Sequence, residues 1–164
     1  MVEEQVRLRL YRPRDEEAVV GLSLRAWGPL FEAAERVVGR ELFARIRGDW
    51  RAGQADDVRE TLSDPAHRVW VAQLSDKSVV GFVAVRLARD SGVGEIAMVA
   101  VDPSAQGRGI GTALTERATD WLKASGMTIA MIETGGDPGH ATARHVYERA
   151  GYTALPAVHY FKAL

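Results

Sequence analysis

Cysteine is absent from the 164 residues of this sequence. Its absence excludes a thiol nucleophile, a cysteine-ligated zinc site and any disulfide bond, and it fits a protein of the cytoplasm. An excess of basic residues is also lacking, because 21 Lys and Arg face 22 Asp and Glu for a formal net charge of -1. Nucleic-acid-binding proteins usually carry such an excess, so we expect no nucleic acid among the partners of this chain.

Long apolar runs are missing as well. The longest, such as residues 79–85, fall far short of the ~20 residues that a membrane-spanning helix needs. The acidic N-terminus, residues 1–5, lacks the apolar segment of a signal peptide. We therefore expect a cytoplasmic protein with no membrane partner.

The composition is that of an ordinary globular protein, with 46% hydrophobic and 26% charged residues. The length favours one domain over residues 1–164, since domains usually have ~100–200 residues. No repeat, low-complexity tract or long linker interrupts that span.

The N-terminal region shows one strand signal followed by one helix signal. Apolar and polar residues alternate over Val6–Leu10, which predicts a half-buried strand. Acidic residues at 15–17 then begin an apolar-periodic run through Trp27, a pattern typical of a helix with acids near its positive end. We expect Gly28-Pro29 to end this helix, because proline removes a helical hydrogen bond.

The middle of the chain changes from helix to strand. Residues 30–62 are helical in composition and are expected to form two pieces that divide near Gly48 or Gly53. Residues 68–74 and 79–87 are rich in β-forming side chains and are joined by a short polar turn. That arrangement predicts an antiparallel hairpin.

The C-terminal part predicts a strand-helix-strand crossover. Residues 95–101 and 127–132 have strand character, and apolar residues of 110–125 share one helical face. Such a crossover makes the two strands parallel neighbours. A further helix with apolar positions 143, 146, 147 and 150 follows, and then a last short strand over 157–161. We therefore expect an α+β fold, a mixed and mostly antiparallel sheet flanked by helices.

Glycines cluster between the predicted strand 95–101 and the helix that follows it. Gln106–Thr112 contains three of them, at positions 107, 109 and 111. A helix start presents unpaired N–H groups and the positive end of the helix dipole. Glycines allow a phosphate to approach such a backbone without an obstructing Cβ. We expect this segment to hold a diphosphate, with a simple flexible turn as the alternative.

Two other phosphate motifs fit less well. A P-loop requires a lysine directly after the glycines, and none is present here. A dinucleotide-binding loop has a third glycine where this chain has Thr112, although Glu133 lies at a suitable distance for the ribose. A doubly wound sheet also needs several crossovers, whereas only one is visible.

The residues from 94 to 152 resemble the GNAT superfamily of acyl-CoA-dependent N-acetyltransferases. The family hallmark Gln/Arg-x-x-Gly-x-Gly/Ala appears as Gln106–Gly111 after the strand end Val99–Pro103. A second family pattern, Asn-x-x-Ala-x-x-x-Tyr-x-x-x-Gly-Phe/Tyr, appears as residues 140–152, with His140 in place of the usual Asn.

The resemblance implies a fold, a cofactor and a set of contacts. The strand before the glycines splays from its parallel neighbour, and the pantetheine arm of acetyl-CoA lies in the gap. By position, the implied cofactor-binding residues are Val99, Ala100, Val101, Gln106, Gly107, Arg108, Gly109, Ile110, Gly111, Thr112, His140 and Tyr147. No metal is implied.

The resemblance also implies two catalytic side chains. Glu95 stands at the family position of a general base, and Tyr147 at that of a general acid for the leaving thiolate. The backbone N–H of Val99 is a plausible oxyanion donor. The alternatives stay open that Glu95 is an exposed residue at a strand start, with water as the base, and that Tyr147 packs in the core.

Together, the sequence motifs and the family resemblance predict that this protein is an N-acetyltransferase. The acetyl group passes from acetyl-CoA directly to a primary amine of a small molecule or peptide, and the protein is a monomer or a homodimer. A non-catalytic acyl-CoA sensor on the same fold is the first alternative. An NAD-dependent oxidoreductase is the second.

Overall fold

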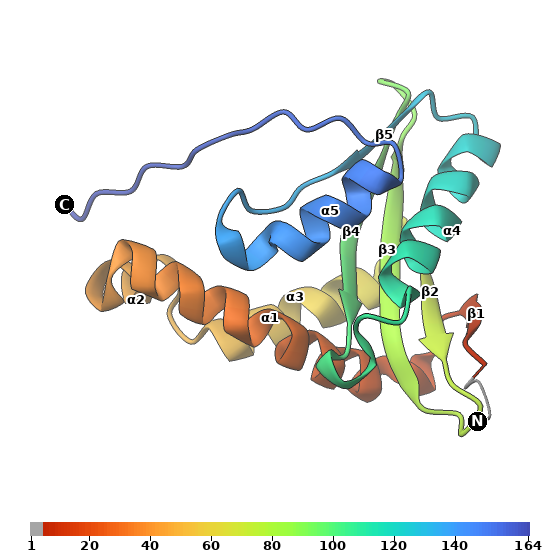
Figure 1. Cartoon of the computed structure of the whole chain (residues 1–164), viewed down its shortest axis with the longest axis horizontal. Coiled ribbons are helices and arrows are strands. Elements are labelled where there is room, and N and C mark those ends of the chain that lie inside the picture. Colours follow the sequence, from red (N-terminus) through yellow and green to blue (C-terminus); the bar gives the residue numbers. More distant parts are fainter. Residues whose placement is uncertain (1–4) are drawn as a thin grey trace.

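The structure is a computed structural model that describes residues 5–164. Residues 1–4 lie outside the described residues. The prediction that the N-terminus is not a signal peptide falls mostly on them. Five strands form one sheet with helices on both faces (Figure 1). Their spatial order follows the sequence, as β1 (Arg7–Leu10), β2 (His67–Gln73), β3 (Val79–Ala88), β4 (Val93–Val101) and β5 (Ile129–Ile132).

Strand directions confirm the predicted mixed sheet. The pairs β1–β2, β2–β3 and β3–β4 are antiparallel, whereas β4 and β5 are parallel. The parallel pairing extends only from Val93–Ile129 to Ile96–Ile132, although β4 continues to Val101. The last part of β4 therefore extends past the end of β5 and has no parallel partner among the described strands, as expected for a splayed pair.

A β-bulge marks the point on β4 where this pairing stops. Ala84 lies opposite Met98 and the next residue, Val85, lies opposite Ile96. Ala97 is therefore an extra residue, which shifts the alternation of side chains between the two faces of the sheet. Ile96 packs in the cluster on one face, and Met98 packs in the cluster on the other.

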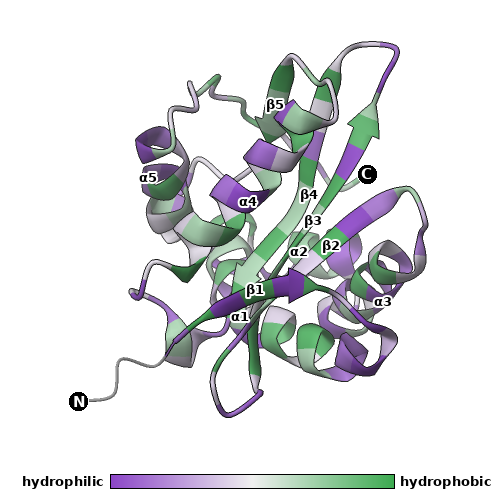
Figure 2. Cartoon of the chain, turned by 90° about the vertical axis from the view of Figure 1, so that its right-hand side faces the viewer, coloured by the Kyte–Doolittle hydropathy of each residue, from purple (hydrophilic) through white to green (hydrophobic). Residues whose placement is uncertain are grey.

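Two apolar clusters hold the helices against the sheet. On one face pack α1 (Glu16–Val38) and α3 (Trp50–Ser63), and on the other packs α4 (Ile110–Ala124). Apolar residues run along most of β3 and β4 between these layers (Figure 2). Helix α4 approaches β4 so closely that a Cβ on Gly94 would lie 2.3 Å from Leu122 Cδ2. Helix α4 and the sheet are thus in close contact near the start of β4.

The prediction that Gly28-Pro29 ends the first helix is wrong. Helix α1 passes through both residues. Beyond them, the ring of Phe31 stacks on Trp50 at 4.5 Å and meets Phe43 of α2 (Arg40–Arg47) at 6.5 Å. A proline inside a helix lowers the stability of that helix by about 3 kcal/mol. The packing of Phe31 against the rings of Phe43 on α2 and Trp50 on α3 offsets a loss of that size.

The division of residues 30–62 predicted near Gly48 or Gly53 occurs at Gly48. Gly48 ends α2, and Gly53 lies inside α3. The additional break at Gly39, between α1 and α2, was not foreseen. Gly39 and Gly48 have φ values of 86° and 56°, which glycine adopts without the penalty of a Cβ.

The C-terminal prediction is partly wrong. Helix α5 (Ala141–Arg149) forms as expected, but residues 157–161 are not a strand. Residues 153–164 follow a stretched course (Figure 1) and make no ladder with any described strand, so the sheet ends at β5. No helix within residues 5–164 combines the length and apolar character needed to cross a membrane.

Candidate active site

The glycine segment connects the end of β4 to the start of α4. Gly107 and Gly109 have φ values of 73° and 77°, and Gly109 is the N-cap of α4. Side chains with a Cβ are strained in this left-handed region. An ideal Cβ on either glycine meets nothing within 4 Å. The outer side of the loop is therefore open, and the backbone there is accessible to a ligand.

The start of α4 presents backbone donors to the same open side. The first helical hydrogen bond runs from Ala113 N to Gly109 O at 3.0 Å. The N–H groups of residues 110–112 precede that bond and have no helical acceptor. Gly109 provides no side-chain cap for them. Positive φ, an open surface and uncapped N–H groups are together what a bound diphosphate requires.

An ion pair with helix α1 anchors this loop. Asp102 Oδ2 accepts hydrogen bonds from Arg25 Nε at 2.8 Å and Nη2 at 2.6 Å. Asp102 Oδ1 accepts from the N–H and hydroxyl of Ser104 at 3.0 and 2.7 Å. Burial acts to raise the pKa of Asp102, but the bonds from Ser104 and Arg25 outweigh it and lower the pKa. Sequence reasoning missed Arg25, because it lies far from the motif in the chain.

Gln106 has a local role in the same loop. Its side-chain Nε2 donates to the carbonyl of Val101 at 3.0 Å. The bond closes the turn between the strand and the glycines. Gln106 is thus placed to shape the loop, while the backbone at Gly107 and Gly109 faces outward.

Glu95 lies toward the other end of β4. It is the direct partner of Arg86 on β3, and Arg86 Nε donates a hydrogen bond to its carboxylate. Its side chain is 24% exposed. An open hollow of about 500 Å³ adjoins it, lined by Arg86, Leu87, Ala88, Ser91, Val93, Glu95 and Met131. The strand rise of ~3.3 Å per residue puts Glu95 about 20 Å from Val101.

Tyr147 is half-buried on α5. Burial, and to a smaller extent the neighbouring Tyr152, raise the pKa of Tyr147 to about 12. Its hydroxyl therefore keeps its proton at neutral pH. The ring of Tyr147 meets that of Tyr152 at 6.3 Å, and the Tyr152 hydroxyl lies 2.7 Å from Thr119 Oγ1 on α4. These contacts connect α5 to the helix that begins at the glycines.

His140 is engaged in the loop before α5. Its Nδ1 lies 2.6 Å from Asp137 Oδ2, and Arg144 Nη1 donates to the carbonyls of Gly135 and Asp137 at 2.6 Å each. Burial opposes ionisation of Asp137, but the hydrogen bond with His140 outweighs it and lowers the pKa of Asp137. At the position where the family pattern has Asn, the His140 side chain thus braces its own loop.

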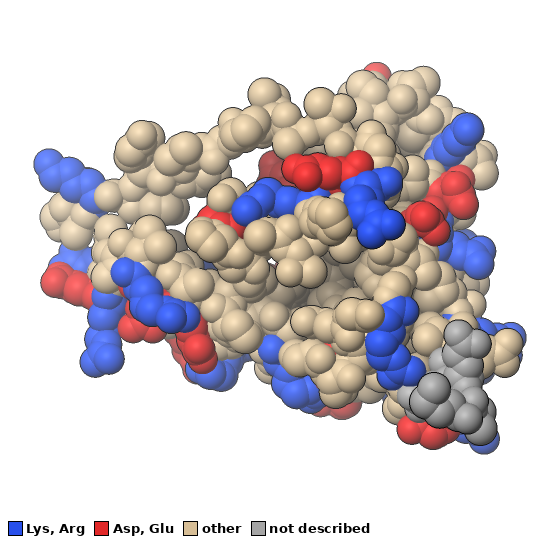
Figure 3. All heavy atoms as spheres, in the orientation of Figure 1, with Lys and Arg blue, Asp and Glu red and all other residues tan. Residues whose placement is uncertain are grey.

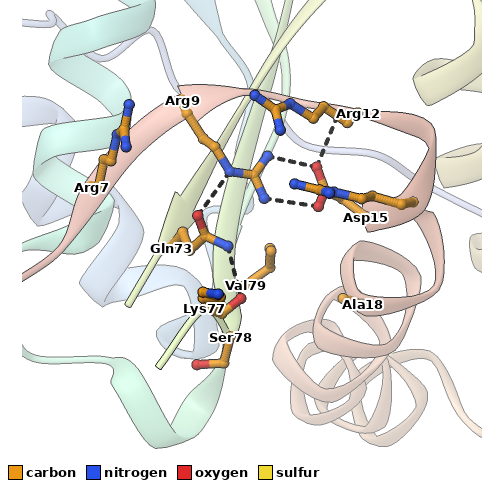
Figure 4. A pocket seen from close by; sticks show the side chains of 10 residues that line it. Arg7, Arg9, Arg12, Asp15, Ala18, Gln73, Lys77, Ser78 and Val79 are labelled. Atoms are coloured by element: carbon orange, nitrogen blue, oxygen red, sulfur yellow. Dashed lines mark hydrogen bonds and ion pairs between the residues drawn. The ribbon is translucent and has the colours of Figure 1, made fainter. Parts of the chain in front are cut away.

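A larger hollow lies away from all these residues. It has about 720 Å³ and is lined by Arg7, Arg9, Arg12, Arg14, Asp15, Ala18, Gln73, Lys77, Ser78 and Val79. At its centre, Arg9 binds both carboxylate oxygens of Asp15 at 2.7 and 2.9 Å and Gln73 Oε1 at 3.0 Å (Figure 4). These bonds join β1 and β2 to the start of α1, which is a structural role.

Comparison with known families agrees with this geometry. The model of the acetyltransferase (GNAT) family matches residues 33–152, which include β4, the glycines and α5. The chain belongs to the GNAT acetyltransferase family. Acetyl-CoA is the acetyl donor of this family. The open, positive-φ loop at the start of α4 fits the diphosphate of that cofactor.

Several named acetyltransferases are similar to this chain. A mycothiol acetyltransferase of Beutenbergia cavernae is 39% identical over 100 residues, which are 61% of this chain and 32% of that protein. An IAA acetyltransferase of Azospirillum brasilense is 32% identical over 126 residues, 76% of this chain and 79% of that protein. The chain spans less than half the length of the mycothiol acetyltransferases that it matches.

A solved structure supports the same fold. The aminoglycoside N-acetyltransferase AAC(6')-Iy in complex with CoA superposes with a TM-score of 0.68 at 17% identity, over 99% of both chains. An identity this low shows the fold alone. The mixed sheet is therefore that of GNAT acetyltransferases and not the doubly wound sheet that the oxidoreductase alternative requires.

Proposed function

We propose that this GNAT protein transfers an acetyl group from acetyl-CoA to a primary amine of a small molecule. The observation that carries the proposal is the loop at Gly107 and Gly109, open to a ligand and continuous with the uncapped start of α4. The part of β4 beyond Ile96 lies next to this loop and has no parallel partner strand. One end of the cofactor site is thus suited to a diphosphate and the other to an extended, hydrogen-bonding arm.

The cofactor, when bound, supplies an acetyl group activated as a thioester. The N–H groups of residues 110–112 hold its diphosphate, and the free backbone of β4 orients its arm. The N–H of Val99 donates to the acetyl oxygen. These roles position the acetyl group without any covalent attachment to the protein, which suits a chain that has no cysteine.

Two side chains carry out the proton transfers of the reaction, one as the general base and one as the general acid. Glu95 accepts a proton from the acceptor amine as the new N–C bond forms, and Tyr147 donates a proton to the sulfur as the C–S bond breaks. The pKa of about 12 keeps Tyr147 protonated before that step. Arg86 orients the Glu95 carboxylate through their hydrogen bond.

The hollow beside Glu95 indicates the size of the acceptor. Its volume of about 500 Å³ falls in the range of ~300–1,000 Å³ typical of small-molecule sites. The similar proteins are named for small molecules, namely mycothiol, IAA and, for the structural neighbour, aminoglycosides. We infer a small amine as the acceptor.

Two measurements test the proposal. Acetyl-CoA at about 100 times its Kd should stabilise the fold by about 2.7 kcal/mol, whereas NAD should leave the Tm unchanged. CoA release is then followed with a library of small primary amines, and Glu95→Gln is the control for background hydrolysis. Stabilisation by acetyl-CoA without turnover on any amine would mean a sensor instead of an enzyme.

A further inference from the structure

The hollow of about 720 Å³ at the β1 edge of the sheet is lined mainly by cationic side chains. It lies where β1, the turn between β2 and β3 and the start of α1 come together (Figure 4). Five cations and one carboxylate line it, a local net charge of +4 in a chain whose formal net charge is -1. The cations are Arg7, Arg9, Arg12, Arg14 and Lys77, and the carboxylate is that of Asp15. A concave surface of one charge sign concentrates ions of the opposite sign.

Among these cations, Arg9 alone forms an ion pair within residues 5–164. It binds both carboxylate oxygens of Asp15, at 2.7 and 2.9 Å. The acids that follow, Glu16 and Glu17, lie 3.9 and 3.3 Å from the guanidinium of Arg59 on α3. Four cations of the hollow therefore have no carboxylate partner in the described part of the chain. On the face shown in Figure 3, by contrast, Lys and Arg side chains lie interspersed with Asp and Glu.

Lys77 occupies a strained backbone position in the turn between β2 and β3. Its φ is 74°, and among residues 5–164 it is the one residue other than glycine with a left-handed φ. Glycine is the usual residue at such a position of a hairpin turn, because it has no Cβ. Gln73 holds the turn in place, since its Nε2 donates to the carbonyl of Lys77 at 2.8 Å and its Oε1 accepts from Arg9. Strained residues cluster at ligand-binding sites, and this one presents a cation to the hollow.

The hollow is separate from the proposed cofactor site. Arg9 stands opposite Val71, which belongs to the apolar cluster beneath α1. Arg7 shares that face of the sheet, because side chains two residues apart on a strand point to the same side. Ala18 of α1 also lines the hollow. Helix α4, which begins at Gly109, packs on the opposite face of the sheet. An anion in the hollow therefore leaves the glycine loop free for acetyl-CoA.

We propose that this hollow binds a small molecule that carries a diphosphate group. Arginine suits phosphate, because its planar fork donates two parallel hydrogen bonds to a pair of oxygens. A single phosphate group carries about two negative charges at neutral pH, which is too little for the four cations without a partner. Two linked phosphates supply the matching charge and reach the cations of β1, of residues 12–14 and of the β2–β3 turn together. The volume of about 720 Å³ leaves room for an organic group attached to the diphosphate.

Titration calorimetry with inorganic pyrophosphate tests this site. The whole chain is saturated with acetyl-CoA beforehand, so that the glycine loop is occupied. We expect one saturable site on the loaded protein, with an affinity that falls as the salt concentration rises, because salt screens exposed charges. No saturable binding to the loaded protein, or binding that acetyl-CoA abolishes, overturns the proposal.

A pair of double variants locates the bound anion. Arg12→Gln with Lys77→Gly should raise the Kd for pyrophosphate at least tenfold, while the Tm does not fall, because glycine suits the φ of 74° at position 77. Arg89→Gln with Lys123→Gln is the matched control. It removes two exposed cations as well, one in the turn between β3 and β4 and one on α4, and neither lines the hollow. Its Kd should equal that of the wild type. The same Kd for both double variants refutes the site.

A comparison of anions tests the ligand class and its source. Inorganic phosphate should bind at least tenfold more weakly than pyrophosphate, because it reaches fewer of the cations. Tighter binding of ADP than of pyrophosphate identifies a nucleoside diphosphate as the ligand, and equal or weaker binding of ADP identifies the free diphosphate. Citrate that binds as tightly as pyrophosphate would show a response to charge alone and would overturn the diphosphate assignment.

Discussion

Glu95 on β4 and Arg86 on β3 stand directly opposite each other, and the guanidinium of Arg86 donates a hydrogen bond to the Glu95 carboxylate. The pair lines the hollow that we assign to the acceptor amine. We predict that Glu95→Gln lowers kcat by about 10²–10⁴-fold, the range for loss of a general base, and leaves the Kd for acetyl-CoA unchanged. Arg86→Gln, which retains the carboxylate, should lower kcat less. Equal kcat for wild type and Glu95→Gln across the pH range would assign the proton to water.

Tyr147 is predicted to act through its hydroxyl. Tyr147→Phe should lower kcat by about 10²-fold, because the leaving sulfur loses its proton donor, with little change in acetyl-CoA affinity. Because burial raises the pKa of Tyr147 to about 12, kcat should show no loss of this acid between pH 7 and 10. Tyr152→Phe is the matched control, since it removes the bond to Thr119 and should cost only about 1 kcal/mol of stability. Full activity of Tyr147→Phe would leave the ring a packing role alone.

Asp102 is predicted to set the position of the glycine loop from outside it. Asp102→Ala removes the acceptor of two Arg25 bonds and two Ser104 bonds. We expect about a tenfold rise in the Kd for acetyl-CoA, measured by titration calorimetry, because the loop loses its connection to α1. Arg25→Gln should have a smaller effect, since its side chain is 59% exposed and exposed ion pairs contribute ~0–1 kcal/mol. An unchanged Kd for Asp102→Ala would remove this positioning role.

The Arg9–Asp15 pair predicts how stability depends on pH. The hydrogen bond from Arg9 is the main cause that lowers the pKa of Asp15 from its ordinary value of 3.8. Both side chains are nearly buried, at 11% and 5% exposure, so Asp15→Asn should cost about 3 kcal/mol, the lower end for a broken buried pair. A lowered pKa stabilises the fold above pH 3.8, and that contribution disappears as the pH falls through the pKa of the folded state.

Urea unfolding of wild type and Asp15→Asn measures this dependence. The difference in the free energy of unfolding should be constant from pH 5 to 8 and should shrink below about pH 4. Glu17→Gln serves as the comparison, because Glu17 is 80% exposed and should change stability by less than about 0.5 kcal/mol. A difference for Asp15→Asn that does not shrink at all as the pH falls below 4 would contradict the assignment.

The sequence predicts the elements whose signals are local. The hairpin of β2 and β3, the crossover from β4 through α4 to β5, and the glycine segment at the start of α4 are all correct, because periodicity and turn residues determine them. The start of α1 after Asp15 is also correct. These are the parts of the chain on which the proposed cofactor site is built.

The features that sequence reasoning missed depend on contacts between distant residues. Pro29 is tolerated inside α1 because Phe31 packs on Trp50, and no local pattern reports that stack. The Arg25–Asp102 bond connects a helix to a loop far along the chain. Residues 157–161 have the composition of a strand, but composition does not provide the backbone pairing that makes one, and these residues form no ladder with any described strand.

Binding of acetyl-CoA by a Gly109→Asn variant tests the central claim most directly. Asn tolerates the left-handed φ of 77° at Gly109 but adds a side chain where the diphosphate is proposed to lie. Gly126→Asn at the other end of α4 is the matched control, with φ 86° and an equally open Cβ position. We predict at least a tenfold rise in Kd for Gly109→Asn and none for Gly126→Asn, with similar small losses in Tm. Equal Kd values for both variants and the wild type would contradict a diphosphate held by the backbone of this loop.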